Sequence, residues 1–106
     1  YDRLAIAGCA QEAAGETIVG VSRYARVEGT RRAECAIVVA DGWQGRGLGT
    51  ELMRTLAEAA KARAIDCLEG TTLAENARIA AWARRFGFPV RTEPNSGGLV
   101  VVRLDL

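Results

Sequence analysis

A glycine-rich stretch between an apolar run and a helical pattern carries the most specific chemical signal in the sequence. It reads Asp41-Gly-Trp-Gln-Gly-Arg-Gly-Leu-Gly49. The first turn of a helix has N–H groups without backbone partners and about half a positive charge, so it attracts phosphate. Glycines let the main chain approach an anion closely, and Arg46 adds a forked cationic donor. The stretch therefore predicts an anion site; the alternative is a tight strand-to-helix turn whose glycines serve geometry only.

The spacing of these glycines argues against two common phosphate-binding motifs. A nucleotide P-loop needs Gly-Lys-Ser/Thr at the helix start, and no lysine follows the glycines here. A dinucleotide fingerprint reads GxGxxG, whereas the glycines from Gly45 onward read GxGxG. The sequence also has no histidine, which excludes Ser-His-Asp and Cys-His nucleophilic machinery and most catalytic zinc sites.

The elements that must position this loop are predicted to form a mixed α/β sheet. Strands are expected over residues 4–9, 17–24, 33–40, 65–71, around 90 and over 99–106. Leucines at four-residue spacing, with abundant alanine, predict a helix from Leu48 to about Ala64. A second helix is expected to end at Gly87. The predicted order is β-β-β-α-β-α-β-β.

Length and composition indicate one globular domain. The 106 residues are 49% hydrophobic and 25% charged, and a net charge of +1 offers no field for nucleic acid or an anionic membrane. No apolar run approaches the roughly 20 residues that span a bilayer. Cys9, Cys35 and Cys67 are separated, so we expect reduced core thiols in a cytoplasmic protein and no metal knuckle. The start at Tyr1, without methionine or leader, predicts a fragment.

Two motifs in the right order resemble the GNAT acyltransferase superfamily. Gln44-Gly-Arg-Gly-Leu-Gly49 is similar to the Gln/Arg-x-x-Gly-x-Gly/Ala signature with which that superfamily binds the pyrophosphate of acetyl-CoA. Glu75-Asn-Ala-Arg-Ile-Ala-Ala-Trp-Ala-Arg-Arg-Phe-Gly-Phe88 resembles the superfamily's Asn-containing helix that ends in Gly-Phe. The resemblance covers residues 17–106, and residues 33–49 most resemble the bacterial protein lysine acetyltransferases.

The resemblance implies a single GNAT-like acetyltransferase domain over residues 1–106, truncated at its N-terminus. Superfamily members usually begin with a strand and two helices that this chain lacks, and that segment helps to build the acceptor site. We therefore expect a fragment that binds cofactor while being catalytically incomplete. The uncovered sheet edge invites pairing, so a homodimer and fusion to a larger parent chain are both candidate arrangements.

Acetyl transfer from acetyl-CoA to an amine needs a base, because a free lysine has a pKa of about 10.4. Glu34 is the first candidate: desolvation on an apolar strand is expected to raise its pKa, and it matches the general base of the resembling lysine acetyltransferases. The alternative is a carboxylate at a frayed strand end, solvated or paired with Arg31 or Arg32. Glu69 is the reserve base, and Glu75 is better explained as a carboxylate at a helix start.

The cofactor contacts implied by the resemblance lie on the third strand and on the glycine-rich loop. Backbone N–H groups near Ile37, Val38 and Val39 are expected to polarise the acyl carbonyl, where a splay between strands leaves one unpaired. The expected cofactor-binding residues are Ile37, Val38, Val39, Gln44, Gly45, Arg46, Gly47, Leu48, Gly49 and Asn76.

Four further residues carry narrower expectations. Asn76 either contacts the cofactor or caps a helix, and Trp43 either stacks near the cofactor or shields the loop. Trp82 has the helical spacing of a core residue. Ala83 occupies the position where many superfamily members have a tyrosine that protonates the leaving thiolate, so the thiolate is expected to leave unassisted.

The sequence as a whole predicts an N-acetyltransferase that uses acetyl-CoA, without a metal. The amine attacks directly with Glu34 as base, and a protein lysine is the favoured acceptor. One rival interpretation is an N-acetyltransferase of small-molecule amines. Others are a non-catalytic acyl-CoA-sensing domain of a larger enzyme and an α/β interaction module without cofactor. Neither nucleic acid nor membrane is expected as a partner.

Overall fold

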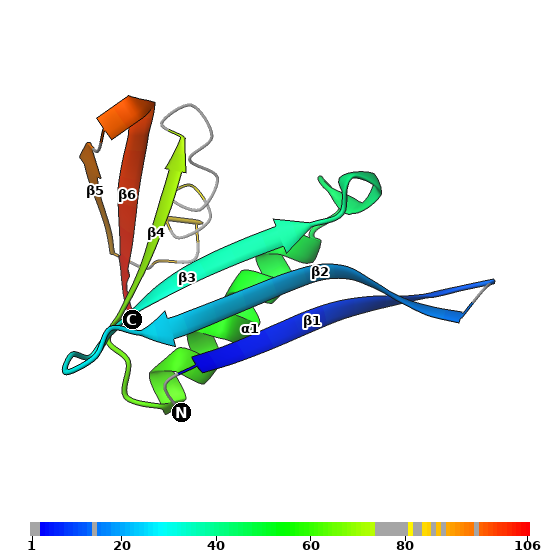
Figure 1. The fold of residues 1–106 in the computed structure, drawn as a ribbon, viewed down its shortest axis with the longest axis horizontal. Helices are drawn as coiled ribbons and strands as arrows, with labels where there is room; N and C mark the ends of the chain where they lie inside the picture. Colours follow the sequence, from blue (N-terminus) through cyan, green and yellow to red (C-terminus); the bar gives the residue numbers. More distant parts are fainter. Residues whose placement is uncertain are drawn as a thin grey trace.

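In the part of the chain that the structure describes, six strands form one mixed sheet, and a helix lies against one face of the first three strands (Figure 1). The computed structural model describes residues 3–13, 15–73, 81, 84–85, 87, 89–94 and 96–106. The elements are β1 (Arg3–Glu12), β2 (Gly15–Arg26), β3 (Arg32–Val39), α1 (Leu48–Ala62), β4 (Cys67–Leu73), β5 (Val90–Pro94) and β6 (Leu99–Asp105), with 3-10 turns at Asp41–Trp43 and Ser96–Gly98. The sheet order is β1-β2-β3-β4-β6-β5. Only the pairing of β3 with β4 is parallel among these strands.

The predicted mixed sheet and first helix are confirmed, with shifted boundaries. Helix α1 ends at Ala62, two residues early, and Ala64 has a left-handed φ of 63°. Ile65 was expected to open a strand but is buried in the connection, and β4 starts at Cys67. The predicted second helix lies mostly outside the described residues. No described helix has the length and apolar character needed to cross a membrane.

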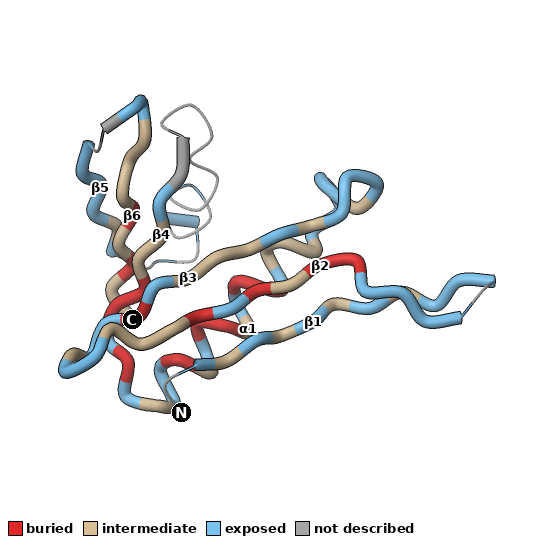
Figure 2. The backbone as a smooth tube through the Cα atoms, viewed as in Figure 1, coloured by how far each residue is buried: buried red, intermediate tan, exposed pale blue. Residues whose placement is uncertain are grey.

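The core lies between α1 and the sheet. The helix buries one stripe, because apolar residues recur every three to four positions on it, and strand residues bury every second side chain. Figure 2 shows these buried positions along α1 and the facing strands. The buried cluster consists of Tyr24, Ala33, Met53, Leu56, Ala57, Ala60, Ile65, Leu68, Val102 and Leu104. The opposite face of β1–β3 carries the alternate residues, which are mainly small or charged.

Two facing glycines let the first turn of α1 approach the sheet closely. Gly8 on β1 pairs with Gly20 on β2. A Cβ atom at Gly20 would lie 2.9 Å from Leu52 Cδ1 and 3.1 Å from Leu48 Cδ2, and one at Gly8 would lie 2.9 Å from Leu48 Cδ1. Contacts of 2.9 Å are closer than real Cβ atoms make, so the ends of the Leu48 and Leu52 side chains would have to move if either glycine carried a side chain.

Strands β3 and β4 part soon after they meet. Their register pairs are Arg32 with Cys67, Ala33 with Leu68, and Glu34 with Glu69. Beyond that last pair β3 continues along β2 and β4 continues along β6 (Figure 1). The splay expected from the sequence is therefore present, and residues 35–39 have no described strand on their β4 side.

The cysteines are free, but they do not all lie in the core. Cys67 is buried and Cys35 is half-buried, whereas Cys9 is exposed, which corrects the expectation of three core thiols. Cys9 lies on the alternate face of β1, where side chains point away from α1. Burial raises the pKa of Cys35 to about 12, so this thiol is a poor nucleophile near neutral pH.

We predict that Gly20→Val destabilises the fold by about 1–3 kcal/mol, because the added side chain meets Leu48 and Leu52 in a packed interface. Urea denaturation measures the change in unfolding free energy. The control is Gly42→Ala: a Cβ at Gly42 has no neighbour within 4 Å, so its effect should stay within about 0.5 kcal/mol. Equal stability of the two variants would contradict the close approach of α1.

Candidate functional site

The loop between β3 and α1 presents the helix start without a side-chain cap. Gly47 is the N-cap residue, in a left-handed conformation with φ 85°, and Gly45 has φ 74°. Glu51 N–H donates to the Gly47 carbonyl at 3.1 Å, which is the first bond of the helix. The amides that precede Glu51 therefore lack intrahelical acceptors, and no side chain caps them. A helix start of this kind can bind an anion.

Both glycines are required by backbone conformation. A Cβ at Gly45 or Gly47 would meet no atom within 4 Å, so crowding within the chain does not explain them. A left-handed conformation costs residues with a Cβ roughly 1–2 kcal/mol, and glycine avoids this cost. Turn geometry and anion binding are thus compatible at this loop, because the conformation that glycine permits also exposes the amides.

Gln44 holds the loop together. Its Nε2 donates to the Val39 carbonyl at 3.2 Å and to Asp41 Oδ1 at 3.3 Å. Its backbone N–H also donates to the Asp41 carbonyl at 3.3 Å. The side-chain nitrogen of this predicted cofactor-binding residue is thus engaged within the turn. Its described contacts support the loop that carries Gly45 and Gly47.

Arg46 stacks on Trp43. The guanidinium carbon lies 4.2 Å from the centre of the Trp43 ring, which is a cation–π contact. Trp43 was expected either to stack near the cofactor or to shield the loop, and the structure gives it a third role as the platform for Arg46. This contact orients a positive charge beside the helix start, where it adds to the partial charge of the amides.

The backbone of β3 offers amides to the splay at alternate residues. Ala40 N–H donates to the Val19 carbonyl of β2 at 2.8 Å. Along an antiparallel strand, the backbone N–H and C=O groups of successive residues point to opposite neighbouring strands, so those of Val38, like those of Ala40, point toward β2. The backbone groups of Ile37 and Val39 point toward the side from which β4 has departed. The Gln44 contact to the Val39 carbonyl comes from that side.

This alternation revises the prediction for residues 37–39. Ile37 and Val39 can present N–H groups to a ligand in the splay, but the amide of Val38 is directed into the β2 ladder. The side chain of Val38 is 68% exposed, on the face away from α1. Val38 can therefore contact a ligand through its side chain only.

Glu34 lies at the apex of the splay and is exposed. The exposure contradicts the expected desolvation, because the Glu34 side chain lies on the face of β3 away from α1. The alternative, an ion pair of Glu34 with Arg31 or Arg32, is also absent among the described residues. Arg32 contacts Glu69 instead, and Arg31 Nε lies 3.9 Å from Asp66 Oδ2. Glu34 thus has no described ion-pair or hydrogen-bond partner, and its carboxylate is accessible.

The neighbouring carboxylate, Glu69, is held in an ion-pair chain. Arg32 Nη1 lies 2.6 Å from Glu69 Oε1, and Arg103 Nε lies 3.6 Å from the same oxygen. Arg103 Nη1 continues the chain to Glu93 Oε2 at 2.6 Å. The Glu69 side chain is only 15% exposed. Glu34 and Glu69 are paired in register across β3 and β4, but only Glu69 has ion-pair partners among the described residues.

These features lie along one line. Gly49, in the first turn of α1, lies beside Val39 at the end of β3. Glu34 lies five residues before Val39 on the same strand, about 16 Å from it at the usual strand rise. An extended ligand with an anionic end and a reactive end can therefore contact the amides of the helix, those of Ile37 and Val39, and Glu34. The predictions for Glu75, Asn76, Trp82 and Ala83 concern residues outside the described part of the chain.

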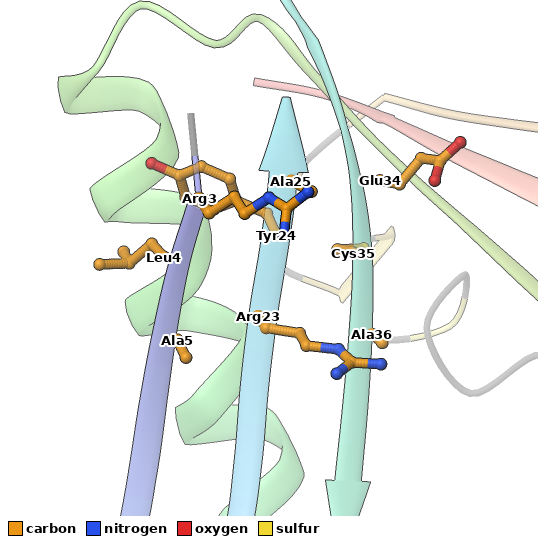
Figure 3. Close-up of a pocket in the computed structure, with 9 residues that line it drawn as sticks. All are labelled: Arg3, Leu4, Ala5, Arg23, Tyr24, Ala25, Glu34, Cys35 and Ala36. Atoms are coloured by element: carbon orange, nitrogen blue, oxygen red, sulfur yellow. The ribbon is translucent and has the colours of Figure 1, made fainter. Parts of the chain in front are cut away.

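The sequence pattern alone did not reveal Arg3, Arg23 or Arg103 as neighbours of the site. Arg3 and Arg23 line a hollow of about 540 Å³ together with Glu34 (Figure 3). Arg103 Nε lies 3.6 Å from Glu69 Oε1. Charged residues at every second strand position are a usable signal for an open face. Knowing which of them meet requires the strand register, and local patterns do not give it.

Comparison with known proteins agrees with this geometry. Residues 3–88 match the sequence model of a family described as "Acetyltransferase (GNAT) family". Acetyltransferase PA5475 of Pseudomonas aeruginosa is 33% identical over 88 residues, which are 83% of this chain and 47% of that protein. The chain thus spans about half the length of that relative.

Two solved structures share the fold. The GNAT domain of S. lividans PAT superposes with a TM-score of 0.75 at 24% identity, over 99% of this chain and 61% of that one. The PaiA N-acetyltransferase of Thermoplasma acidophilum, in complex with coenzyme A, has a TM-score of 0.76 at 16% identity, over 99% and 62%. At these identities the two structures support the fold of this chain.

The loop geometry predicts opposite effects for two glycines that are two positions apart. Gly47→Ala should destabilise the protein by about 1–2 kcal/mol, because alanine must adopt the left-handed N-cap conformation. Gly49→Ala should stabilise it by about 0.5–1 kcal/mol, because Gly49 lies within α1 and its added Cβ makes ordinary contact with Val39 at 3.8 Å. Thermal denaturation of both variants tests this, and a shift of the same sign in both would contradict it.

Proposed function

Because the chain belongs to the GNAT family of acetyltransferases, we propose that it transfers an acetyl group from acetyl-CoA to an amine. The observation that carries the proposal is the parting of β3 from β4 directly after the Glu34–Glu69 pair. The splay joins an uncapped helix start at one end to an accessible carboxylate at the other. A thioester cofactor with a diphosphate end needs these two contacts and an extended channel between them.

The cofactor's diphosphate would lie at the start of α1. The amides that follow Gly45 and Gly47 supply hydrogen-bond donors, and Arg46 supplies a cation held on Trp43. Leu48 and Gly49 belong to the same first turn. The remaining cofactor arm would follow β3, where Ile37 and Val39 direct their backbone groups into the splay. One of these N–H groups would polarise the thioester carbonyl and hold its developing negative charge.

Glu34 is our proposed general base. An amine acceptor with a pKa of about 10.4 is protonated at neutral pH, and removing that proton at pH 7 costs about 4.6 kcal/mol. The accessible carboxylate of Glu34 can take the proton directly or through water as the amine nitrogen bonds to the acyl carbon. The C–S bond then breaks, and the thiolate leaves carrying the electron pair.

Glu69 is less suited to this role. Its Oε1 already accepts from Arg32 at 2.6 Å, and Arg103 lies at 3.6 Å, so the oxygen is occupied by cationic donors. Its contacts favour a positioning role, in which it links β3 to β4 and β6 at the apex of the splay. A protein lysine remains the favoured acceptor, on the resemblance of residues 33–49 to protein lysine acetyltransferases.

We predict that Glu34→Gln lowers kcat by about 10²- to 10⁴-fold while leaving the affinity for acetyl-CoA unchanged, because the variant loses a proton acceptor. Steady-state acetylation of a lysine peptide and calorimetric titration of acetyl-CoA measure the two quantities. Glu58→Gln, an exposed position on the outer side of α1, is the control. An active Glu34→Gln protein together with an inactive Glu69→Gln protein would move the base to Glu69.

Arg46→Gln should weaken coenzyme A binding by roughly tenfold, because one charge-assisted contact to the diphosphate is lost. The loss should shrink at high salt, since the interaction is exposed and screened. Titration calorimetry at two salt concentrations measures it. Arg54→Gln removes an arginine on the far side of α1 and serves as the control. Equal affinity of the two variants would place the diphosphate elsewhere.

A further inference from the structure

We infer that the acceptor carries an anionic group close to its amine, recognised by Arg23 and Arg3 beside Glu34. The inference rests on the proposed function and names the class of acceptor for the same site. Its basis is a hollow of about 540 Å³ on the face of β1–β3 that lies away from α1. Figure 3 shows its lining residues.

Strand register places the three charged residues in a checkerboard. Arg3 pairs with Ala25, and Ala25 pairs with Glu34, so these residues form one row across β1, β2 and β3. In the next row on this face, Ala5 pairs with Arg23, and Arg23 pairs with Ala36. Each arginine therefore lies beside alanines, whose small side chains leave the hollow open.

The arginines extend over these alanines toward β3. In Figure 3, Arg3 crosses β2 beside Ala25, and Arg23 crosses to β3 beside Ala36. Ala36 is two residues beyond Glu34, which corresponds to about 7 Å along the strand. An anion held by Arg23 would therefore lie about this far along β3 from an amine placed at Glu34. This spacing suits an α-carboxylate or the side chain of an acidic residue next to a lysine.

Charge balance favours the same class of acceptor. Arg3 and Arg23 have no ion pair or hydrogen bond to any described residue, so their charges are available to a ligand. Glu69, the nearest other carboxylate by register, is already compensated by Arg32 and Arg103. A polycationic acceptor would meet two uncompensated guanidinium groups, whereas an acceptor with a carboxylate would neutralise one.

Matched acceptors test this inference. The probes are two lysine peptides that differ only in aspartate or asparagine beside the lysine, and an amino acid compared with its methyl ester. The protein is expected to acetylate either the peptides or the amino acid. In that pair of acceptors, kcat/KM with acetyl-CoA and the full chain should be about fivefold higher for the anionic member, which is the effect of one exposed ion pair between acceptor and arginine. Raised salt should reduce this ratio. The productive pair distinguishes a peptide acceptor from a free amino acid.

Variants then assign the effect to the arginines. Arg23→Gln should abolish the preference, and Arg23→Glu should reverse it toward the neutral acceptor, while Arg54→Gln keeps it. Equal kcat/KM for both members of a pair, or a preference that survives Arg23→Gln and Arg3→Gln together, would overturn the inference and leave the proposed function intact. Acetyl-CoA binding without transfer to any acceptor would instead overturn the proposed function, and the inference with it.

Discussion

The brevity of the β3–β4 pairing is the constraint on which the rest of the structure depends. Three register pairs join the two strands before each follows a different neighbour. Backbone groups that a continuous sheet would consume are left facing a gap, and buried or unsatisfied groups of this kind are costly unless water or a ligand pairs with them. The incomplete ladder is therefore both a weakness of the sheet and the origin of the binding site that we propose.

A second constraint ties the loop to the core. The start of α1 reaches the splay because Gly8 and Gly20 allow Leu48 and Leu52 to lie directly on β1 and β2. Apolar packing thus places the amides to which we assign the diphosphate. The loop itself is fixed by local bonds, those of Gln44 and the stack of Arg46 on Trp43. The packing of Leu48 and Leu52 on the sheet thus fixes the position of the amides at the helix start. The contacts of Gln44 and Arg46 fix the conformation of the loop that leads to them.

Local sequence patterns predicted most of the fold and part of the site. Four-residue leucine spacing identified α1, runs of apolar and β-branched residues identified the mixed sheet, and the glycine spacing identified the loop at Gly45 and Gly47. The exposure of Glu34 was missed, because an apolar strand does not reveal whether its second face is covered. The partner of Arg32 was missed because it lies 37 positions away, and only strand register connects them.

The ion-pair chain from Arg32 through Glu69 and Arg103 to Glu93 spans four strands, and it has an evolutionary consequence. A single sign change within the chain leaves like charges facing each other, whereas two compensating changes restore the alternation. Related sequences should therefore drift at these four positions in correlated steps. Replacing all four charged residues with apolar ones would remove these ion pairs and leave an apolar surface across the four strands.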